Sequence, residues 1–324
     1  MLLEINNLCK DYSTGFLGNR KIHAVDDVSL CINEGEMFGL IGESGCGKST
    51  LTKMILGLIK PTDGSIKYNG KEISNLGEKQ WLPLRKEIQA VFQHPQMTFN
   101  PKKNLYYSCA EPLRLFDMCD KSSEEYLVRE MTECVGISFD QLKKFPHEIS
   151  GGQAQRISIA RALSLNPRLL ICDEPTTALD VTIQAQIMDI LKELQEQLGI
   201  SIVLITHNMG LVAQMASDVC VMYMGRIVEK GTREEIFLNP RHPYTQALLK
   251  SVPVLGMAND KKLETIPGIT PNPADLKEGC EFADRCTYCK NECRTGKISL
   301  YKENENHSVR CLLYKERGWD CETN

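Results

Sequence analysis

Apolar and polar positions change their spacing along the first 60 residues. Residues 2–8 and 22–32 alternate in the period of a strand, and the Gly-rich polar residues 12–20 between them predict a loop. Residues 37–42 form a short apolar run that ends at a Gly-rich turn. Residues 48–59 then carry Leu51, Ile55 and Leu58 at helical spacing, before Pro61 and Gly64. Strand, Gly-rich loop and helix in this order predict an α/β fold.

The pattern continues with buried strands and helices. Residues 88–92, 169–173, 200–206 and 218–224 are apolar runs of strand length, and residues 100–165 have mainly helical character. Residues 181–198 predict an amphipathic helix that Gly199 ends. Its apolar face comprises Ile183, Ile187, Ile190, Leu191, Leu194 and Leu198. After Asn239 the density of Pro and Gly rises and helical periodicity weakens, so we expect an irregular extension there.

Composition limits the class of protein. Hydrophobic residues make up 42% and charged residues 25% of the 324, with a formal net charge of −4, which is typical of a globular chain and not of a basic nucleic-acid-binding protein. No run reaches the ~18 to 20 apolar residues that span a bilayer. The N-terminus lacks the basic and apolar regions of a signal peptide. We therefore expect a cytoplasmic protein that serves any membrane process by docking onto another chain.

The first candidate site is a phosphate-binding loop. Residues 42–50 fit the pattern G-x-x-x-x-G-K-[ST], between an apolar strand and an amphipathic helix. Glycines let several backbone N–H groups point at one phosphate, and the helix N-terminus adds its dipole. Lys48 brings a positive charge to the phosphates, and the Ser49 hydroxyl is a ligand suited to Mg²⁺. The predicted nucleotide contacts of this loop are Gly42, Ser44, Gly45, Cys46, Gly47, Lys48, Ser49 and Thr50.

Two carboxylates end the strand at residues 169–173. Asp173 is placed to hold Mg²⁺ through water, and Glu174 to polarise an attacking water. Taken alone, two acidic residues at a strand end could simply be part of a helix N-cap region. Beside a P-loop, however, the catalytic interpretation is favoured. His207 and Gln93 also follow apolar strands, and neither is distinctive in isolation.

Ser150-Gly151-Gly152-Gln153 precedes a helix about twenty residues before that strand and resembles the signature of ABC ATPases. The family's other motifs follow the same order along the chain. Tyr12 matches the aromatic residue that stacks on adenine, Gln93 the Q-loop, Asp173 and Glu174 the Walker B pair, Ala178-Leu179-Asp180 the D-loop and His207 the switch histidine. Ile149 stands where Leu is usual, and His94 where Asp is common.

The resemblance implies a P-loop NTPase fold, with a RecA-like core, an antiparallel β subdomain and a helical subdomain at about residues 95–165. It covers residues 1–250 and leaves 251–324 as the irregular Cys-rich extension. Two such chains would enclose two MgATP molecules, each between the P-loop of one chain and the signature of the other. Lys48, Gln93, Glu174 and His207 would serve catalysis, with Ser49, Gln93 and Asp173 around Mg²⁺.

Residues 239–245, 266–268 and 279–286 resemble the oligopeptide/dipeptide/nickel importer ATPases. This subfamily implies a second, homologous ATPase in a heterodimer, two permease chains and an external solute-binding protein, with no nucleic acid. The chain would sit at the cytoplasmic face of the membrane. Peptide and nickel both remain open as cargo.

Six of the 14 cysteines lie in the last 45 residues. Spacing and ligand softness alone leave iron–sulfur, zinc and no metal open, with His307 as a further zinc candidate. The subfamily pattern implies a [4Fe–4S] cluster on Cys280, Cys286, Cys293 and Cys311, and does not use Cys289. Such a cluster would hold together an extension with little apolar surface.

Two other classes of function compete. A soluble ABC ATPase of DNA repair or ribosomes usually has two cassettes or a long coiled-coil insertion, and this chain shows neither. A regulatory module that binds ATP without turnover is disfavoured by the intact Lys48, Glu174 and His207.

Overall fold

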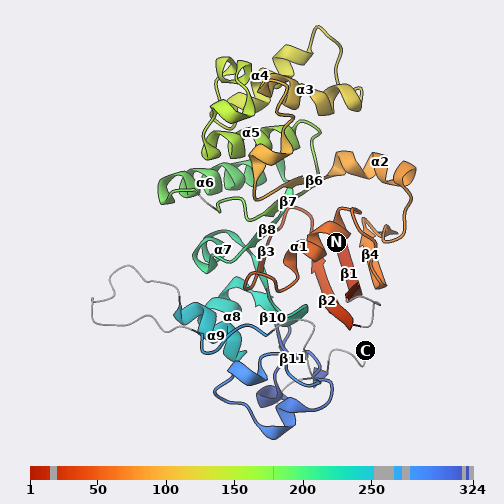
Figure 1. The fold of residues 1–324 in the computed structure, drawn as a ribbon, viewed down its shortest axis with the longest axis vertical. Helices are drawn as coiled ribbons and strands as arrows, with labels where there is room; N and C mark the ends of the chain where they lie inside the picture. The colour runs from red at the N-terminus through yellow and green to blue at the C-terminus, as the bar shows by residue number, and fades with distance from the viewer. Residues whose placement is uncertain (15–19, 178, 252–265, 272–277, 316–318, 321–324) are drawn as a thin grey trace. The chain divides into compact units, whose positions relative to one another are not determined.

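The computed structural model describes residues 1–14, 20–177, 179–251, 266–271, 278–315 and 319–320 (Figure 1). The chain divides into two compact units. The first unit comprises Met1–Ile32, Phe38–Ser74 and Thr206–Asn324, and the second comprises Asn33–Met37 and Asn75–Ile205.

The first unit contains a four-stranded antiparallel sheet in the order β2-β1-β4-β5. The strands are β1 (Leu3–Thr14), β2 (Arg20–Ile32), β4 (Asp63–Tyr68) and β5 (Lys71–Glu72). Leu3, Ile5, Leu8 and Val28 have no exposed surface, which explains the apolar alternation of these segments. Strand β1 continues to Thr14, so the first residues of the predicted loop at 12–20 are strand instead, paired with β2.

A second set of strands in the first unit carries the phosphate loop. Strand β3 (Met37–Ile41) runs parallel to β9 (Asp218–Tyr223), and β9 pairs antiparallel with β10 (Arg226–Thr232). The helices of this unit are α1 (Lys48–Ile55), α7 (Met209–Met215), α8 (Arg233–Leu238) and α9 (Pro243–Lys250). Helix α1 ends at Ile55, earlier than the periodicity through Leu58 predicts, because the chain turns at Gly57 with φ of 65°.

The C-terminal extension is more regular than predicted. Strand β12 (His307–Val309) pairs with β10, β11 (Tyr301–Asn304) pairs with β12, and β13 (Trp319–Asp320) pairs with β11. The expectation of an irregular extension is thus wrong for this part of the chain, because β10 offers an edge to which a hairpin of low apolar content can bind. Short 3₁₀ turns connect the rest, η5 (Ala283–Arg285), η6 (Asn291–Arg294) and η7 (Leu312–Tyr314).

The second unit is built around three parallel strands in the order β6-β7-β8. These are β6 (Ile88–Val91), β7 (Leu169–Asp173) and β8 (Ser201–Thr206), and the residues of β8 are buried throughout. The helices are α2 (Glu78–Glu87), α3 (Leu105–Leu115), α4 (Glu124–Glu133), α5 (Gly151–Leu163) and α6 (Val181–Leu198), with 3₁₀ turns η1 (Pro95–Thr98), η2 (Phe139–Lys143) and η3 (Pro146–Glu148). Gly199 ends α6 in the left-handed conformation with φ of 64°, as predicted.

Among the helices of the described residues, none combines the length and the apolar character that crossing a bilayer requires.

Candidate nucleotide site

The predicted phosphate loop connects β3 to α1. Every residue of β3 is buried, and α1 begins at Lys48. Gly47 lies between them with φ of 108°, a conformation that side chains rarely adopt, and a Cβ atom there would meet the Ala24 carbonyl oxygen at 2.3 Å. A glycine is therefore required at this position for the loop to close onto the start of the helix.

Lys48 is held inside the loop. The residue is 5% exposed, and its ammonium donates to the carbonyl oxygens of Gly42 at 2.7 Å and Glu43 at 2.9 Å. Ser44, Gly45 and Ser49 are exposed, Thr50 is half-buried, and Cys46 is buried. Burial raises the pKa of the Cys46 thiol, which makes it a packing residue rather than a nucleophile. The loop thus fixes the position of the Lys48 ammonium and exposes Ser49 to solvent.

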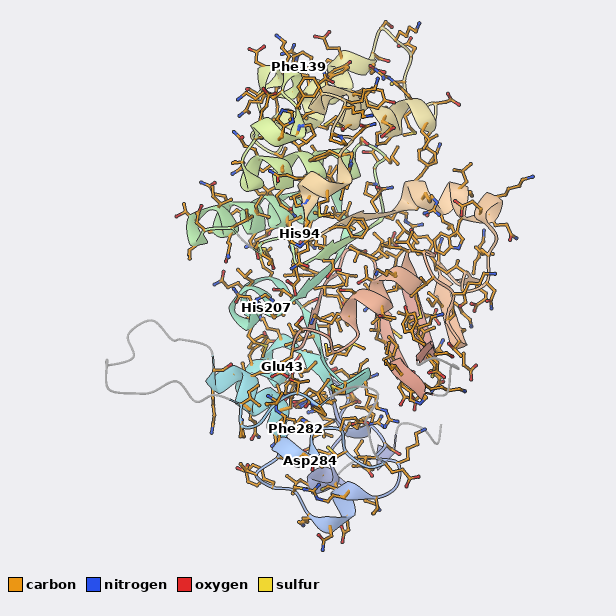
Figure 2. All side chains as sticks on the ribbon, in the orientation of Figure 1. Glu43, His94, Phe139, His207, Phe282 and Asp284 are labelled. Atoms are coloured by element: carbon orange, nitrogen blue, oxygen red, sulfur yellow. The ribbon has the colours of Figure 1, made fainter. Side chains whose placement is uncertain are left out.

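Two further predicted residues belong to this unit. Tyr12 lies on β1 and is 39% exposed, with the ammonium of Lys10 5.4 Å from its ring centroid. His207 is exposed and follows Thr206, directly before the Asn208 that caps α7 (Figure 2).

In the second unit, Glu174 follows the last residue of β7, Asp173, and both are half-buried. Glu174 has a φ of 48°, which is strained for a residue with a side chain. Its Oε2 accepts hydrogen bonds from Gln93 Nε2 at 3.0 Å and from Thr177 Oγ1 at 2.7 Å. The fold therefore brings two predicted catalytic residues, Gln93 and Glu174, into direct contact.

Thr177 was not predicted from the sequence. It is three residues beyond Glu174, at the distance where a hydroxyl can reach back to a carboxylate in a turn, and this spacing was the available signal.

The signature segment begins helix α5. Ser150 is its N-cap: Oγ accepts from the backbone N–H of Gln153 at 3.2 Å, and the Ser150 N–H donates to Gln153 Oε1 at 3.1 Å. Ser150 and Gly151 are exposed. Gly152 is buried, and a Cβ atom there would meet Ile183 Cγ2 at 2.7 Å. The helix thus presents an exposed N-terminus, the arrangement that binds anions.

Asp180 caps the next helix, α6, by accepting from the Ile183 N–H at 2.9 Å. Ala178 of the predicted D-loop lies outside the described residues. Tyr12, the phosphate loop and His207 belong to the first unit, whereas Gln93, Ser150, Asp173, Glu174 and Asp180 belong to the second. The magnesium site predicted from Ser49, Gln93 and Asp173 combines both units and stays a prediction.

Five cysteines in the described part of the extension line one small cavity. The cavity measures about 20 Å³, and the five lining cysteines are Cys280, Cys286, Cys289, Cys293 and Cys311. Burial raises the pKa of Cys280 to about 12 and that of Cys311 to about 11. Within the described part of the chain, however, no three His, Cys, Asp or Glu side chains form a group that could hold a metal ion.

Three comparisons with known proteins place the chain in a family. Residues 25–177 match the family described as ABC transporter, and residues 228–293 match the oligopeptide/dipeptide transporter, C-terminal region. Residues 146–213 also match an AAA domain family described as a putative AbiEii toxin. The oligopeptide transport ATP-binding protein AppD of Bacillus subtilis is 42% identical over 98% of this chain and 98% of its own length. The chain belongs to the ABC transporter ATP-binding proteins.

Other relatives agree with this assignment. The oligopeptide transport ATP-binding protein OppF of Haemophilus influenzae is 39% identical over 96% of this chain and 97% of its own length. Among solved structures, the dimeric post-hydrolysis state of the ATP-binding cassette MJ0796, bound to ADP and Pi, has a TM-score of 0.65 and 28% identity. The similarity covers 72% of this chain and 99% of the MJ0796 chain. The resemblance drawn from the motifs is confirmed, and with it the ABC cassette fold. Members of this family are ATPases that power transport.

Proposed function

We propose that this chain binds MgATP and hydrolyses it to drive the uptake of oligopeptides. The family match over both the cassette and the C-terminal region carries this proposal. The relatives named above are oligopeptide transport ATP-binding proteins, which favours peptides over nickel as cargo.

The residues of the site divide the chemistry between them. Lys48 and the N–H groups of residues 42–50 bind the phosphates, and Tyr12 stacks on the adenine. Ser49, Gln93 and Asp173 hold Mg²⁺, while Glu174 accepts a proton from the attacking water and His207 holds the γ-phosphate. Ser150 and the following glycines bind the γ-phosphate on a second cassette, and Asp180 faces that cassette.

The contact between Gln93 and Glu174 supports the catalytic assignment. The Glu174 carboxylate already accepts two hydrogen bonds, both at Oε2, so its position is fixed. A strained backbone at a carboxylate with this support is typical of functional sites.

The test is Glu174→Gln, which keeps the shape and the contact with Thr177 but removes the basic oxygen. In the assembled transporter we expect ATP binding to persist and hydrolysis to fall by ~10² to 10⁴. Glu196→Gln, on the exposed side of α6, is the matched control and should hydrolyse ATP at the wild-type rate. Normal turnover in Glu174→Gln would remove Glu174 from the mechanism.

Exposed apolar side chains support the proposed partners. Met97 is 83% exposed in η1, four residues after Gln93, where a permease chain would cover it. Val181 is 82% exposed beside Asp180, where a second ATPase would cover it. We propose a heterodimer with a homologous ATPase on two permeases at the cytoplasmic face of the membrane, supplied by an external solute-binding protein.

We also propose that Cys280, Cys286, Cys293 and Cys311 hold a [4Fe–4S] cluster. The support is the chemistry of the donors: these four soft sulfur ligands line one cavity. In the described residues the thiols are not gathered into a ligand group, so binding a cluster requires them to move together. The raised pKa values of Cys280 and Cys311 mean that these thiols stay protonated without a cation to stabilise their thiolates. Bound there, the cluster would cross-link the extension.

Iron and sulfide analysis after anaerobic purification tests the cluster. We expect about four irons per chain, retained by Cys289→Ser and lost from Cys286→Ser. One zinc per chain, or no metal, would refute the cluster and leave the ATPase assignment intact.

A further inference from the structure

A residue of the C-terminal extension contacts the phosphate loop directly. Arg285 lies between Cys280 and Cys286 in turn η5, and its side chain is only 6% exposed. Its guanidinium binds both carboxylate oxygens of Glu43, the second residue of the loop, with Nη1–Oε2 at 2.8 Å and Nη2–Oε1 at 3.1 Å. Glu43 and Phe282, three residues before Arg285, can both be located in Figure 2.

The guanidinium is fixed by further bonds. Its Nε donates to the Pro267 carbonyl oxygen at 2.9 Å, and Nη1 also lies 3.3 Å from Tyr223 Oη. Thr270 Oγ1 donates to the same Glu43 carboxylate at 2.9 Å. Because the planar guanidinium is held on several sides and bonds both carboxylate oxygens, it keeps the Glu43 side chain in one orientation. A lysine ammonium lacks this two-pronged geometry.

The backbone of Glu43 is the other half of this arrangement. Its N–H donates to Tyr244 Oη at 2.9 Å, and its carbonyl oxygen accepts from Lys48 Nζ at 2.9 Å. Tyr244 is fully buried, with its ring centroid 4.5 Å from that of Tyr223 and 5.4 Å from that of Phe282. The residue that positions the Lys48 ammonium is thus held, at side chain and backbone, by residues from the last third of the chain.

We propose that Arg285 is a positioning residue of the phosphate loop, through which the segment 279–294 is energetically coupled to nucleotide binding. The inference rests on the proposed function, in that the loop binds ATP. Arg285 touches Glu43 and acts on the nucleotide through the loop. Because coupling between two sites is reciprocal, bound MgATP stabilises segment 279–294 by the same factor by which an intact segment strengthens ATP binding.

The experiment compares full-length variants in two measurements. Titration with a fluorescent MgATP analogue reports nucleotide affinity, and backbone amide exchange of residues 279–294 reports the segment. We expect Arg285→Met to weaken nucleotide binding about 10-fold, within the usual range for coupled sites. MgATP should slow amide exchange in the segment of the wild type but not of this variant.

Matched variants distinguish positioning from general damage. Arg294→Met removes an arginine of the same segment that pairs with Asp284 on the surface, and it should behave as wild type in both measurements. Glu43→Gln should weaken binding like Arg285→Met, and the double variant should be no weaker than either single one, because both remove the same contact. Arg285→Lys should recover only part of the affinity. Glu43→Gln and Arg285→Lys keep the test decisive if Arg285→Met does not fold.

Two results would overturn the inference. One is nucleotide affinity of Arg285→Met within twofold of wild type, with MgATP still protecting the segment. The other is additive losses in the double variant, which would mean that Arg285 does not act through Glu43. A wild type that binds no MgATP would instead refute the proposed function.

Discussion

Glu229 gives the sharpest stability prediction. This carboxylate on β10 has no exposed surface and accepts three hydrogen bonds. Its Oε1 lies 2.6 Å from the Arg241 N–H and 2.7 Å from His307 Nε2, and Oε2 lies 3.0 Å from the His242 N–H. In Glu229→Gln, one of the two oxygens becomes an NH₂ group that cannot accept, so at least one buried donor loses its partner.

The magnitude follows from those three bonds. An orphaned buried donor costs about 1–3 kcal/mol, and the two bonds that remain lose their charge assistance. We therefore expect unfolding free energy to fall by about 2–4 kcal/mol. Urea unfolding followed by circular dichroism measures this, with the exposed Glu305→Gln as control. A loss below about 0.5 kcal/mol, the usual scale of surface changes, would refute the reasoning.

Three further predictions concern His242, Lys48 and Gly152. Burial lowers the pKa of His242 to about 4, below the ~6.5 of the unfolded chain, so protons bind preferentially to the unfolded state. Stability should fall by up to ~3 kcal/mol as the pH drops from about 6.5 to 4. His242→Asn should flatten this dependence of stability on pH, whereas the exposed control His147→Asn should leave it unchanged. Curves of stability against pH that run parallel for His242→Asn and wild type would contradict the prediction. Lys48→Ala should abolish ATP binding in an equilibrium titration, and affinity within a few-fold of wild type would count against the phosphate loop. Gly152→Ala should destabilise by about 1–3 kcal/mol through its clash with Ile183, and an unchanged thermal midpoint would show that α6 yields freely.

Much of the core could be predicted because its signals are local. The buried run at 169–173 and the amphipathic pattern at 181–198 each identify their own element, and Gly199 marks where the helix stops. The phosphate loop is equally local, since its glycines and Lys48 all lie within residues 42–48. The order of the motifs supplied the family, which spacing alone could not.

The parts that escaped prediction depend on partners far along the chain. Strand β12 has few apolar residues, and its place is set by the Glu229–His307 contact across 78 residues. The Arg285–Glu43 pair spans 242 residues, and neither residue stands out in its own segment. No element was predicted at helix α2, which contains Pro83, a residue that is unfavourable inside a helix.

The N-cap of α5 shows why a serine suits the signature. Asp would cap a helix about as well as Ser, but its negative charge would repel an anion at the same N-terminus. Ser150 uses an oxygen lone pair for the cap, toward the Gln153 N–H, so its own O–H can still donate outward. A neutral side chain with both a donor and an acceptor can cap the helix and also donate to the phosphate that we propose binds there. Asp lacks the donor, and Ala lacks both groups.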